Sequence, residues 1–322
     1  MKLSFYGASG GVTGSNFLLE TADNKKILID CGLFQGSRFI EKQNHEPLAY
    51  DPKQLDAVVV SHAHLDHCGR LPLLWRHGYR GPIYSTAATA DLAKLIMSDA
   101  AGVMLFELED SSEEPLSLSV DVEAVATLFK PIDYGQIEDI LPGIKLELFD
   151  AGHILGSASI KLTADGKTVV FSGDIGNHPV PLVSEPVKPD IADYVVMETT
   201  YGGRLHDSPH ERKAKLRQVV KQAMAKKGVL LIPAFALERT QEILYEFGKL
   251  VDEAAIPPVP IFLDSPLAIE ITRVYYQYLP LFDEESQKII KQGADLFSFP
   301  LLTVTESTAK SKSIANTEGP KI

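Results

Sequence analysis

Short apolar runs alternate with turn-forming residues along the N-terminal part of the chain. Runs rich in β-branched and aromatic residues, bounded by Gly, Asn and Asp, predict short strands. Two longer stretches repeat apolar residues at helical spacing and predict helices at 87–107 and 120–129. The predicted strands are 2–6, 16–20, 26–30, 56–60, 145–150, 158–163, 168–172 and 194–198. Strands with interleaved helices predict an α/β fold, arranged as a sandwich or a layered sheet.

The pattern changes after Tyr201. Ser208 and Pro209 open a predicted helix with one apolar stripe, and Gly228 ends it. The following elements are predicted as a strand at 229–233, a helix at 237–250, a strand at 259–265 and helices at 267–278 and 284–292. This alternation predicts a smaller parallel βαβ domain. The Ser/Thr/Lys-rich segment 305–313 predicts a loop.

Composition narrows the class of protein. The 322 residues are 45% hydrophobic, which is enough for a globular core. The formal net charge of −12 repels polyanions, so nucleic acid would have to bind at a local basic groove or a metal. The two cysteines, Cys31 and Cys68, give no disulfide framework, and no apolar run reaches the ~18 residues that span a bilayer. We therefore expect a cytoplasmic protein that does not bind membranes.

The segment SHAHLDHCGR, residues 61–70, concentrates metal-ligand side chains. It follows the apolar run 56–60, and the carboxyl ends of strands are where α/β proteins place their sites. His62 and His64 lie two residues apart, so in extended backbone they point the same way and can hold one ion. Asp66 and His67, at the turn into a helix near Leu71, face a neighbouring point. An isolated histidine is usually a surface or core residue, but this spacing favours a loop that serves two metals.

Two further ligand candidates follow predicted strands. His153 comes after KLELFD, and Asp174 comes after TVVFS. Glycines near both, at 152, 156, 173 and 176, leave room for close backbone approach. Since two zinc-sized ions need more than four ligands, we expect both residues to complete the site.

Taken in order, these residues carry a family resemblance. Asp30 in LIDCG, the run His62-x-His64-x-Asp66-His67, His153 and Asp174 resemble the first four motifs of the metallo-β-lactamase superfamily. The resemblance implies an αββα sandwich with a two-zinc site at its open edge. The alternative for Asp30 is an aspartate that caps a turn at a strand end.

The later sequence resembles one branch of that superfamily, the β-CASP nucleases. The stretches METTYGG, IPAFALERTQEIL and FLDSPLA carry this resemblance, and Glu198 matches the first motif of the β-CASP cassette. We therefore expect a metallo-β-lactamase domain at 1–205 and the N-terminal part of a β-CASP domain at 206–322. Glu198 could alternatively be an ordinary acid at a strand end.

The chain departs from the family pattern at its C-terminal side. The family's two cassette histidines and one further zinc-ligand histidine lie beyond the later strands, and no histidine follows His210 here. We therefore expect a truncated chain, weakly active or inactive, in which the second zinc lacks a ligand and the general acid is unidentified.

The resemblance implies roles for the matching residues. His62, His64 and His153 would hold one zinc, Asp66 and His67 the second, and Asp174 would bridge both. Asp30 would orient the metal loop from behind, and Glu198 would lie near the scissile phosphate. A hydroxide bridging the ions would hydrolyse phosphodiester bonds of single-stranded RNA, giving 5′-phosphate and 3′-hydroxyl ends.

Other interpretations remain open. The protein could hydrolyse a small ester, thioester or lactam, or act as an inactive scaffold subunit for RNA processing; a homodimer is an open alternative to a monomer. Cys68 favours a buried structural role over a metal-binding one. Arg239 and Thr240 could contact phosphate or form an exposed helical pair, and Ser265 could line a groove or cap a helix. The apolar stripe in the basic stretch at 212–227 indicates that its charges form the solvent-exposed face of an amphipathic helix rather than a nucleic-acid-binding patch.

Overall fold

The computed structural model describes residues 1–107, 115–177, 179–204 and 211–322. These residues form two compact units. Unit 1 contains residues 1–176 and 185–200, and unit 2 contains residues 177–184 and 201–322. The expected division into domains at 1–205 and 206–322 stays a prediction, as does the helix start at Ser208 and Pro209, which lies outside the described residues.

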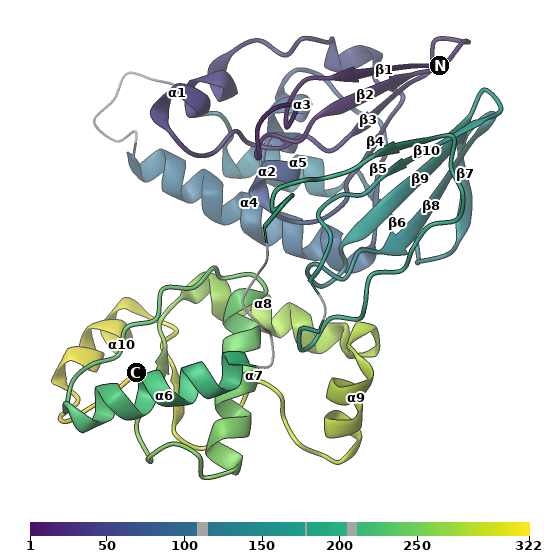
Figure 1. Ribbon diagram of the computed structural model, residues 1–322. Helices are drawn as coiled ribbons and strands as arrows, with labels where there is room; N and C mark the ends of the chain where they lie inside the picture. The colour runs from purple at the N-terminus through teal and green to yellow at the C-terminus, as the bar shows by residue number, and fades with distance from the viewer. Residues whose placement is uncertain (108–114, 178, 205–210) are drawn as a thin grey trace. The chain divides into compact units, whose positions relative to one another are not determined.

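Unit 1 is built on two sheets (Figure 1). The first sheet has the order β1 (Lys2–Phe5), β2 (Phe17–Glu20), β3 (Lys26–Ile29), β4 (Ala57–Val59), β5 (Ile83–Ser85) and β6 (Phe129–Pro131). The second has the order β11 (Tyr194–Val196), β10 (Lys167–Phe171), β9 (Ala158–Ala164), β8 (Ile144–Asp150) and β7 (Ile137–Leu141). In the first sheet the strands β3 to β6 run parallel, and in the second β10 and β11 do.

One hydrophobic core joins the two sheets. Side chains of Ile27 and Val59 from the first sheet and of Leu146 and Ile160 from the second belong to the same fully buried cluster. Alternating apolar residues on facing strands bury one side of each sheet against the other, which is the packing of a β-sandwich. The predicted α/β class with a two-sheet sandwich is therefore confirmed.

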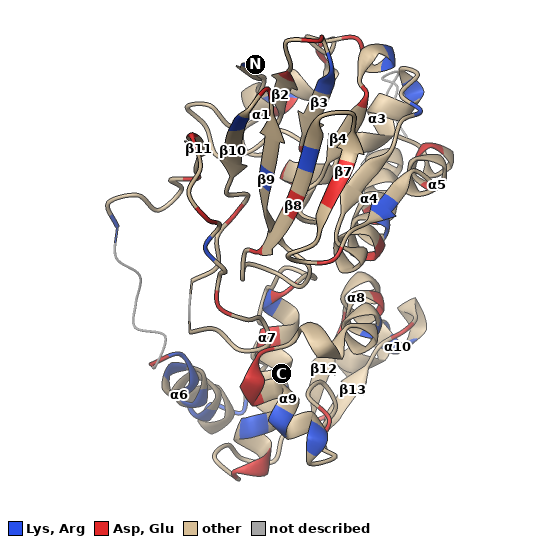
Figure 2. Cartoon of the chain, turned by 90° about the vertical axis from the view of Figure 1, so that its right-hand side faces the viewer, with Lys and Arg blue, Asp and Glu red and all other residues tan. Residues whose placement is uncertain are grey.

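Helices line the first sheet, whereas the second sheet has a charged outer face. The helices of unit 1 are α1 (Arg38–Glu41), α2 (Leu65–Cys68), α3 (Leu71–Arg76), α4 (Ala87–Glu107) and α5 (Ser119–Ala126). Of these, α4 matches its predicted range. Charged residues follow β7, β8 and β9 in Figure 2, and Lys161 pairs there with Glu147 at 3.3 Å.

The helix predicted at 120–129 is too long at its C-terminal end. It ends at Ala126 because Phe129 begins β6, which pairs in parallel with β5. The three-residue strands β5 and β6 and the strand β7 were not predicted, because strand pairing between distant segments leaves little pattern in runs this short.

Unit 2 contains a small parallel sheet with helices around it. Its elements are α6 (Arg212–Ala225), α7 (Arg239–Asp252), β12 (Ile261–Leu263), α8 (Pro266–Gln277), α9 (Glu284–Lys291), β13 (Leu302–Val304) and α10 (Thr308–Ser313). A parallel βαβ arrangement is present, because β12 and β13 pair in parallel across α8 and α9, but its second strand β13 was not predicted and the predicted partner strand at 229–233 does not form.

Three predictions for unit 2 were wrong in part. The segment 229–233 forms an isolated bridge from Val229 to Lys321 and no continuous strand. The segment 305–313 is not all loop, since Ser307 caps α10 and Thr305 is buried. The apolar stripe of α6 buries Val220 and Met224 but leaves Val219 exposed, and its basic residues are spread around the helix in Figure 2.

Among the described residues, no helix combines the length and the apolar character that crossing a bilayer requires.

Candidate metal centre

The candidate ligands come from loops at one end of the two sheets of unit 1. Asp30 directly follows β3, and the segment from Ser61 to His67 follows β4, which runs parallel to β3. His153 follows β8, Asp174 follows β10, and these two strands run in the same direction because each is antiparallel to β9. The carboxyl ends of these strands therefore meet at the same edge.

Close backbone contact draws the loops together. A side chain on Gly176 would lie 1.6 Å from the carbonyl oxygen of Gly152, so only glycine allows the Asp174 loop to reach the His153 loop. A side chain on Gly32 would similarly meet the carbonyl oxygen of Asp66 at 1.6 Å. Both contacts place backbone where a Cβ atom would otherwise stand.

Four side chains form a tight group, called here the ligand cluster: His62, His64, His153 and Asp174. Their ligand atoms all lie within 4.8 Å of one another. Nδ1 of His64 is 3.1 Å from Nε2 of His62 and 3.2 Å from Nε2 of His153. Oδ2 of Asp174 lies 3.7 Å from Nε2 of His62 and 3.6 Å from Nε2 of His153.

These spacings suit a divalent ion. In a tetrahedral zinc site with bonds of about 2.0–2.1 Å, neighbouring ligand atoms lie ~3.3–3.4 Å apart. Nδ1 of His64 carries one proton or one lone pair, so a hydrogen bond can satisfy one of its two imidazole neighbours but not both. A cation bound between the nitrogens would replace the hydrogen bond that cannot form. The cluster therefore fits a bound metal.

Ser61 and Asp30 set the orientation of the imidazoles behind the cluster. The Ser61 hydroxyl donates to Oδ2 of Asp30 at 2.8 Å, which leaves the Ser61 oxygen to accept from Nδ1–H of His62 at 3.0 Å. Nδ1–H of His67 donates to Oδ2 of Asp30 at 2.7 Å. The ring of His62 therefore keeps an unprotonated Nε2 for a metal, and the ring of His67 is fixed in orientation by Asp30, as the second shell of many metal sites requires.

Asp30 itself is held in a demanding conformation. It is 1% exposed, its Oδ1 accepts from the backbone N–H of Ser61 at 2.7 Å, and its φ is +56°. Positive φ is rare for residues other than glycine and concentrates at functional sites. This geometry exceeds what a simple turn cap needs.

His67 and Asp66 lie on the other side of Asp174. Nε2 of His67 is 3.2 Å from Oδ1 of Asp174 and 4.0 Å from Oδ2 of Asp66. One carboxylate oxygen of Asp174, Oδ2, thus faces His62 and His153, and the other, Oδ1, faces His67. Both Asp66 and His67 belong to the one-turn helix α2 rather than to a turn leading directly into α3.

The pKa values divide the imidazoles into two kinds. Burial, together with the neighbouring imidazoles, holds the pKa of His62 well below its ordinary value and lowers that of His64 to about 3. Burial also acts to lower the pKa of His67, but the carboxylates of Asp30 and Asp174 outweigh it and leave the pKa well above ordinary. His62 and His64 are therefore neutral and able to bind a metal over the physiological pH range.

The carboxylates respond to the same surroundings. Burial acts to raise the pKa of Asp174, but its hydrogen bond to His67 and the positive charge of that imidazole lower it to about 2. Burial raises the pKa of Asp66, which lies farther from a partner. Asp174 is thus ionised wherever the protein is folded at ordinary pH.

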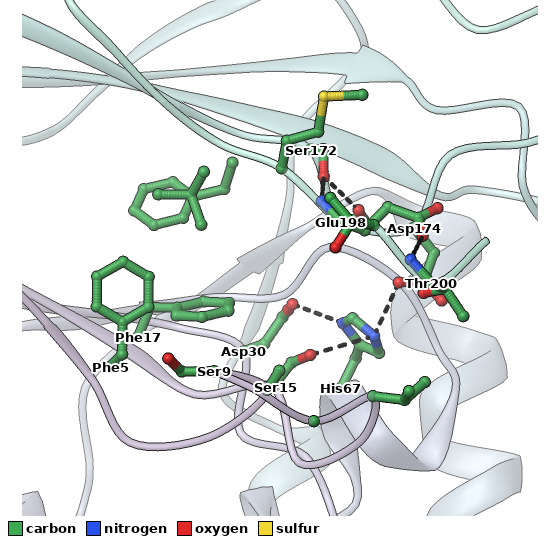
Figure 3. Close-up of a pocket in the computed structure, with 18 of the residues that line it drawn as sticks. Phe5, Ser9, Ser15, Phe17, Asp30, His67, Ser172, Asp174, Glu198 and Thr200 are labelled. Atoms are coloured by element: carbon green, nitrogen blue, oxygen red, sulfur yellow. Dashed lines mark hydrogen bonds and ion pairs between the residues drawn. The ribbon is translucent and has the colours of Figure 1, made fainter. Parts of the chain in front are cut away.

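Glu198 lies close to the Asp174 loop. Its Oε1 accepts from the backbone N–H of Ile175 at 3.0 Å, and its Oε2 accepts from that of Thr200 at 3.2 Å. Figure 3 shows Glu198 and Asp174 on one wall of a cavity, opposite Asp30, Ser15 and His67. Two backbone hydrogen bonds therefore fix the Glu198 carboxylate beside the Asp174 loop, whereas an ordinary acid at a strand end would point freely into solvent.

Two stretches of the chain match known families. Residues 9–234 match the metallo-beta-lactamase superfamily, and residues 240–322 match the Beta-Casp domain. The chain belongs to the β-CASP nuclease family of the metallo-β-lactamase superfamily. Membership confirms the predicted family and the predicted enzyme class, a metal-dependent hydrolase. Metal binding is a property that this fold implies and that the ligand cluster fits.

Curated relatives of this β-CASP protein include bacterial and archaeal members. It is 39% identical over 322 residues to "Ribonuclease TTHA0252" of Thermus thermophilus, covering 100% of this chain and 72% of the relative. It is 35% identical over 305 residues to "Transcription termination factor FttA" of Methanosarcina mazei, covering 91% and 46%. Identity to an "RNase J-like protein" of Methanocaldococcus jannaschii is 32% over 300 residues, covering 92% and 65%. The chain thus spans about half of the FttA protein.

Sequence reasoning missed Ser61, although it directly precedes His62 at a strand end. Four other residues that the sequence suggested as possible site residues make contacts within the fold of the β-CASP protein. Cys68 is fully buried and its thiol donates to the carbonyl oxygen of Ala63, as the structural interpretation predicted. Ser265 caps α8 by accepting from the N–H of Ala268. Arg239 pairs with Glu242, and Thr240 donates to the carbonyl oxygen of Phe235.

Proposed function

We propose that this β-CASP protein is a zinc-dependent ribonuclease that hydrolyses phosphodiester bonds in single-stranded RNA. The observation that carries the proposal is the ligand cluster, three imidazole nitrogens and one carboxylate oxygen within 4.8 Å, with Asp174 shared toward His67. Ribonuclease names among its relatives support RNA as the substrate.

The residues divide into two ligand sets. His62, His64 and His153 would hold one zinc, Asp66 and His67 would hold a second, and Asp174 would contribute one oxygen to each. Imidazole nitrogens and carboxylate oxygens are ligands that zinc accepts. When bound, a zinc pair supplies a water of lowered pKa and positive charge that offsets the charge developing on the phosphate.

The remaining residues act on these ligands or on the substrate. Asp30 fixes the ring of His67 through Nδ1, so that Nε2 stays directed at Asp174. Ser61 fixes the ring of His62 in the same way. The carboxylate of Glu198, held by two backbone N–H groups, would lie beside the scissile phosphate and orient a proton donor. We expect 5′-phosphate and 3′-hydroxyl products.

The proposal is tested by metal content and cleavage in parallel. The purified chain is loaded with zinc, dialysed and analysed for bound metal, then incubated with a 5′-labelled linear RNA and a circular RNA. The matched variants are His64→Ala, inside the ligand cluster, and His45→Ala, an exposed histidine outside it. We expect the wild-type chain to bind zinc and to cleave RNA weakly, His64→Ala to lose both zinc and cleavage, and His45→Ala to keep both.

Each other outcome selects a different function. Zinc binding with hydrolysis of a thioester or a chromogenic lactam, but not of RNA, would favour a small-molecule hydrolase. Zinc binding with RNA binding and no hydrolysis would favour a scaffold subunit. Equal zinc binding by the wild type and His64→Ala would reject the metal centre. Cleavage of the circle would show internal cutting.

We also propose a cytoplasmic location, since Cys31 and Cys68 are both free and buried, as in proteins of reducing compartments. A homodimer remains a proposal that sedimentation of the purified chain would test.

A further inference from the structure

A cavity of about 430 Å³ lies beside the metal centre and is lined only by residues of unit 1. One end is polar and contains Asp30, His67, Asp174 and Glu198, which the proposed hydrolysis uses. The other end is apolar. There the rings of Phe5 and Phe17 lie across from the metal ligands, as Figure 3 shows. The proposed chemistry leaves this apolar end without a role.

The apolar end keeps a large hydrophobic surface in water. Phe5 is 47% exposed, and Val12 and Met197, which also line the cavity, are each 62% exposed. The ring of Phe5 packs edge-on against that of Phe17 at 5.5 Å between centroids, and Phe17 packs against the buried Phe171 at 5.8 Å. The core therefore fixes the position of the exposed ring, and a flat ligand could stack without ordering it first.

The same end offers hydrogen-bond donors. The loop from Ala8 to Val12 lines the cavity. In the described structure, the backbone N–H groups of Ser9, Gly10, Gly11 and Val12 donate to no protein acceptor. Ser9, Gly10 and Gly11 are also exposed, so these donors are accessible to a ligand. Backbone donors of this kind commonly bind phosphate and carbonyl oxygens.

We propose that the apolar end is a nucleobase subsite, in which a base next to the scissile phosphate stacks on Phe5. The loop N–H groups then donate to oxygens of that nucleotide. This proposal rests on the proposed ribonuclease function, because an occupant continuous with the metal centre must carry the bond that is cut. A volume of about 430 Å³ is sufficient for one nucleotide. Stacking uses the face that every base has, so the subsite predicts binding with little sequence preference.

The experiment measures equilibrium binding, so it does not depend on turnover. A short, fluorescently labelled, phosphorothioate-substituted RNA is titrated with zinc-loaded wild type, Phe5→Ala, Phe5→Trp and Phe106→Ala, and anisotropy gives Kd. Phe106 is an exposed phenylalanine on α4 that does not line the cavity, so it is the matched control. We expect Phe5→Ala to weaken binding roughly 5- to 150-fold, the range of single-base stacking. Phe5→Trp and Phe106→Ala should bind as the wild type does.

A second set of RNAs identifies the ligand. Each carries one abasic position, which removes a base but keeps the sugar and phosphate. We expect one abasic position to weaken binding to the wild type by about the factor that Phe5→Ala causes, and to cause no further loss in Phe5→Ala. Zinc content and melting temperature of Phe5→Ala should match the wild type, which separates a lost contact from a misfolded chain.

The outcomes separate this subsite from the parent function. If the wild type binds RNA but Phe5→Ala binds equally well, or if its loss is independent of the abasic position, the subsite is rejected and the ribonuclease proposal stands. If the zinc-loaded wild type binds no RNA, both are rejected.

Discussion

Two groups of polar side chains, one in each unit, differ in how their charges and hydrogen bonds are satisfied. In the ligand cluster of unit 1, imidazole nitrogens face one another and Asp174 without enough protons for each contact to be a hydrogen bond. In unit 2, a group called here the helix-start group consists of Glu238, Gln241, Thr272 and Tyr275. There Nε2 of Gln241 donates to Thr272 at 2.9 Å, and the Tyr275 hydroxyl donates to Glu238 at 2.5 Å.

The comparison separates two reasons for burying polar side chains. The helix-start group links α7 and α8 through two donors that each meet an acceptor and so needs no cation, although Oε1 of Gln241 has no hydrogen-bond partner among the described residues. The ligand cluster instead collects acceptors, which is costly unless a cation joins them. Variants should therefore affect metal content in one unit and folding free energy in the other.

The largest effect is expected for Asp174→Ala. This change removes an oxygen from each proposed ligand set, so both zinc ions should be lost on dialysis. RNA cleavage should fall by more than the roughly hundredfold that the loss of a partner behind a metal ligand already costs. Zinc analysis and cleavage rates check this, and an Asp174→Ala protein with full zinc content would contradict the assignment of Asp174 as the shared ligand.

The next effect is expected for Asp30→Asn, which keeps the shape but replaces a carboxylate oxygen that accepts from His67 and Ser61. Zinc affinity should fall about 10- to 100-fold, the usual range for the carboxylate behind a ligand histidine. Competition with a zinc chelator measures it. The exposed Asp139→Asn on β7 is the control, and equal affinities for both variants would mean that Asp30 is only a turn cap.

A smaller effect, in the other unit, is expected for Gln241→Leu. Gln241 is fully buried, and its Nε2 also donates to the carbonyl oxygen of Ala236 at 3.1 Å. Leaving these acceptors unpaired should lower the free energy of unfolding by about 1–2 kcal/mol. Urea denaturation measures this loss, and zinc content should stay at the wild-type value. Loss of zinc in Gln241→Leu would erase the distinction between the two groups.

Sequence patterns identified the candidate ligands because each lies just after a strand, and a strand's direction fixes where its loop emerges. The spacing of His62 and His64 was enough to identify them as candidate ligands, and the strand that precedes Asp174 was enough to identify Asp174. Ser61 could not be assigned, because its role depends on Asp30, a residue 31 positions away in the chain. The cavity could not be predicted either, since Phe5, Val12 and Met197 line one cavity only after both sheets have formed. The prediction of a strand at 229–233 was wrong in part, because an apolar run indicates a strand, but a strand also needs a neighbouring strand to pair with along its length.

The smallest effect is expected for a carboxyl of unit 1 outside the ligand cluster. Asp150 ends β8, three residues before His153, and accepts from the backbone N–H of Gly152 at 2.8 Å. Burial raises the pKa of Asp150 to about 6, against the single favourable effect of that hydrogen bond. The pKa of Asp174, which is surrounded by imidazoles, is lowered instead. Comparing the two residues therefore shows how the imidazoles change the pKa of a carboxyl in this unit.

The pH dependence of Asp150→Asn follows from this shift. A carboxyl whose folded pKa exceeds its unfolded value of 3.8 binds its proton more tightly in the folded state, so its contribution is most favourable below pH 3.8. As the pH rises through about 6, the buried carboxylate ionises and destabilises the fold. Asparagine keeps the acceptor and has no such charge. Asp150→Asn should therefore be more stable than the wild type by about 1 kcal/mol at pH 8, allowing for partial exposure, with little difference near pH 4. Urea denaturation across this pH range measures the difference, and Asp139→Asn should show no such trend. A gain that is equal at both pH values would mean that packing, rather than the buried charge, is responsible.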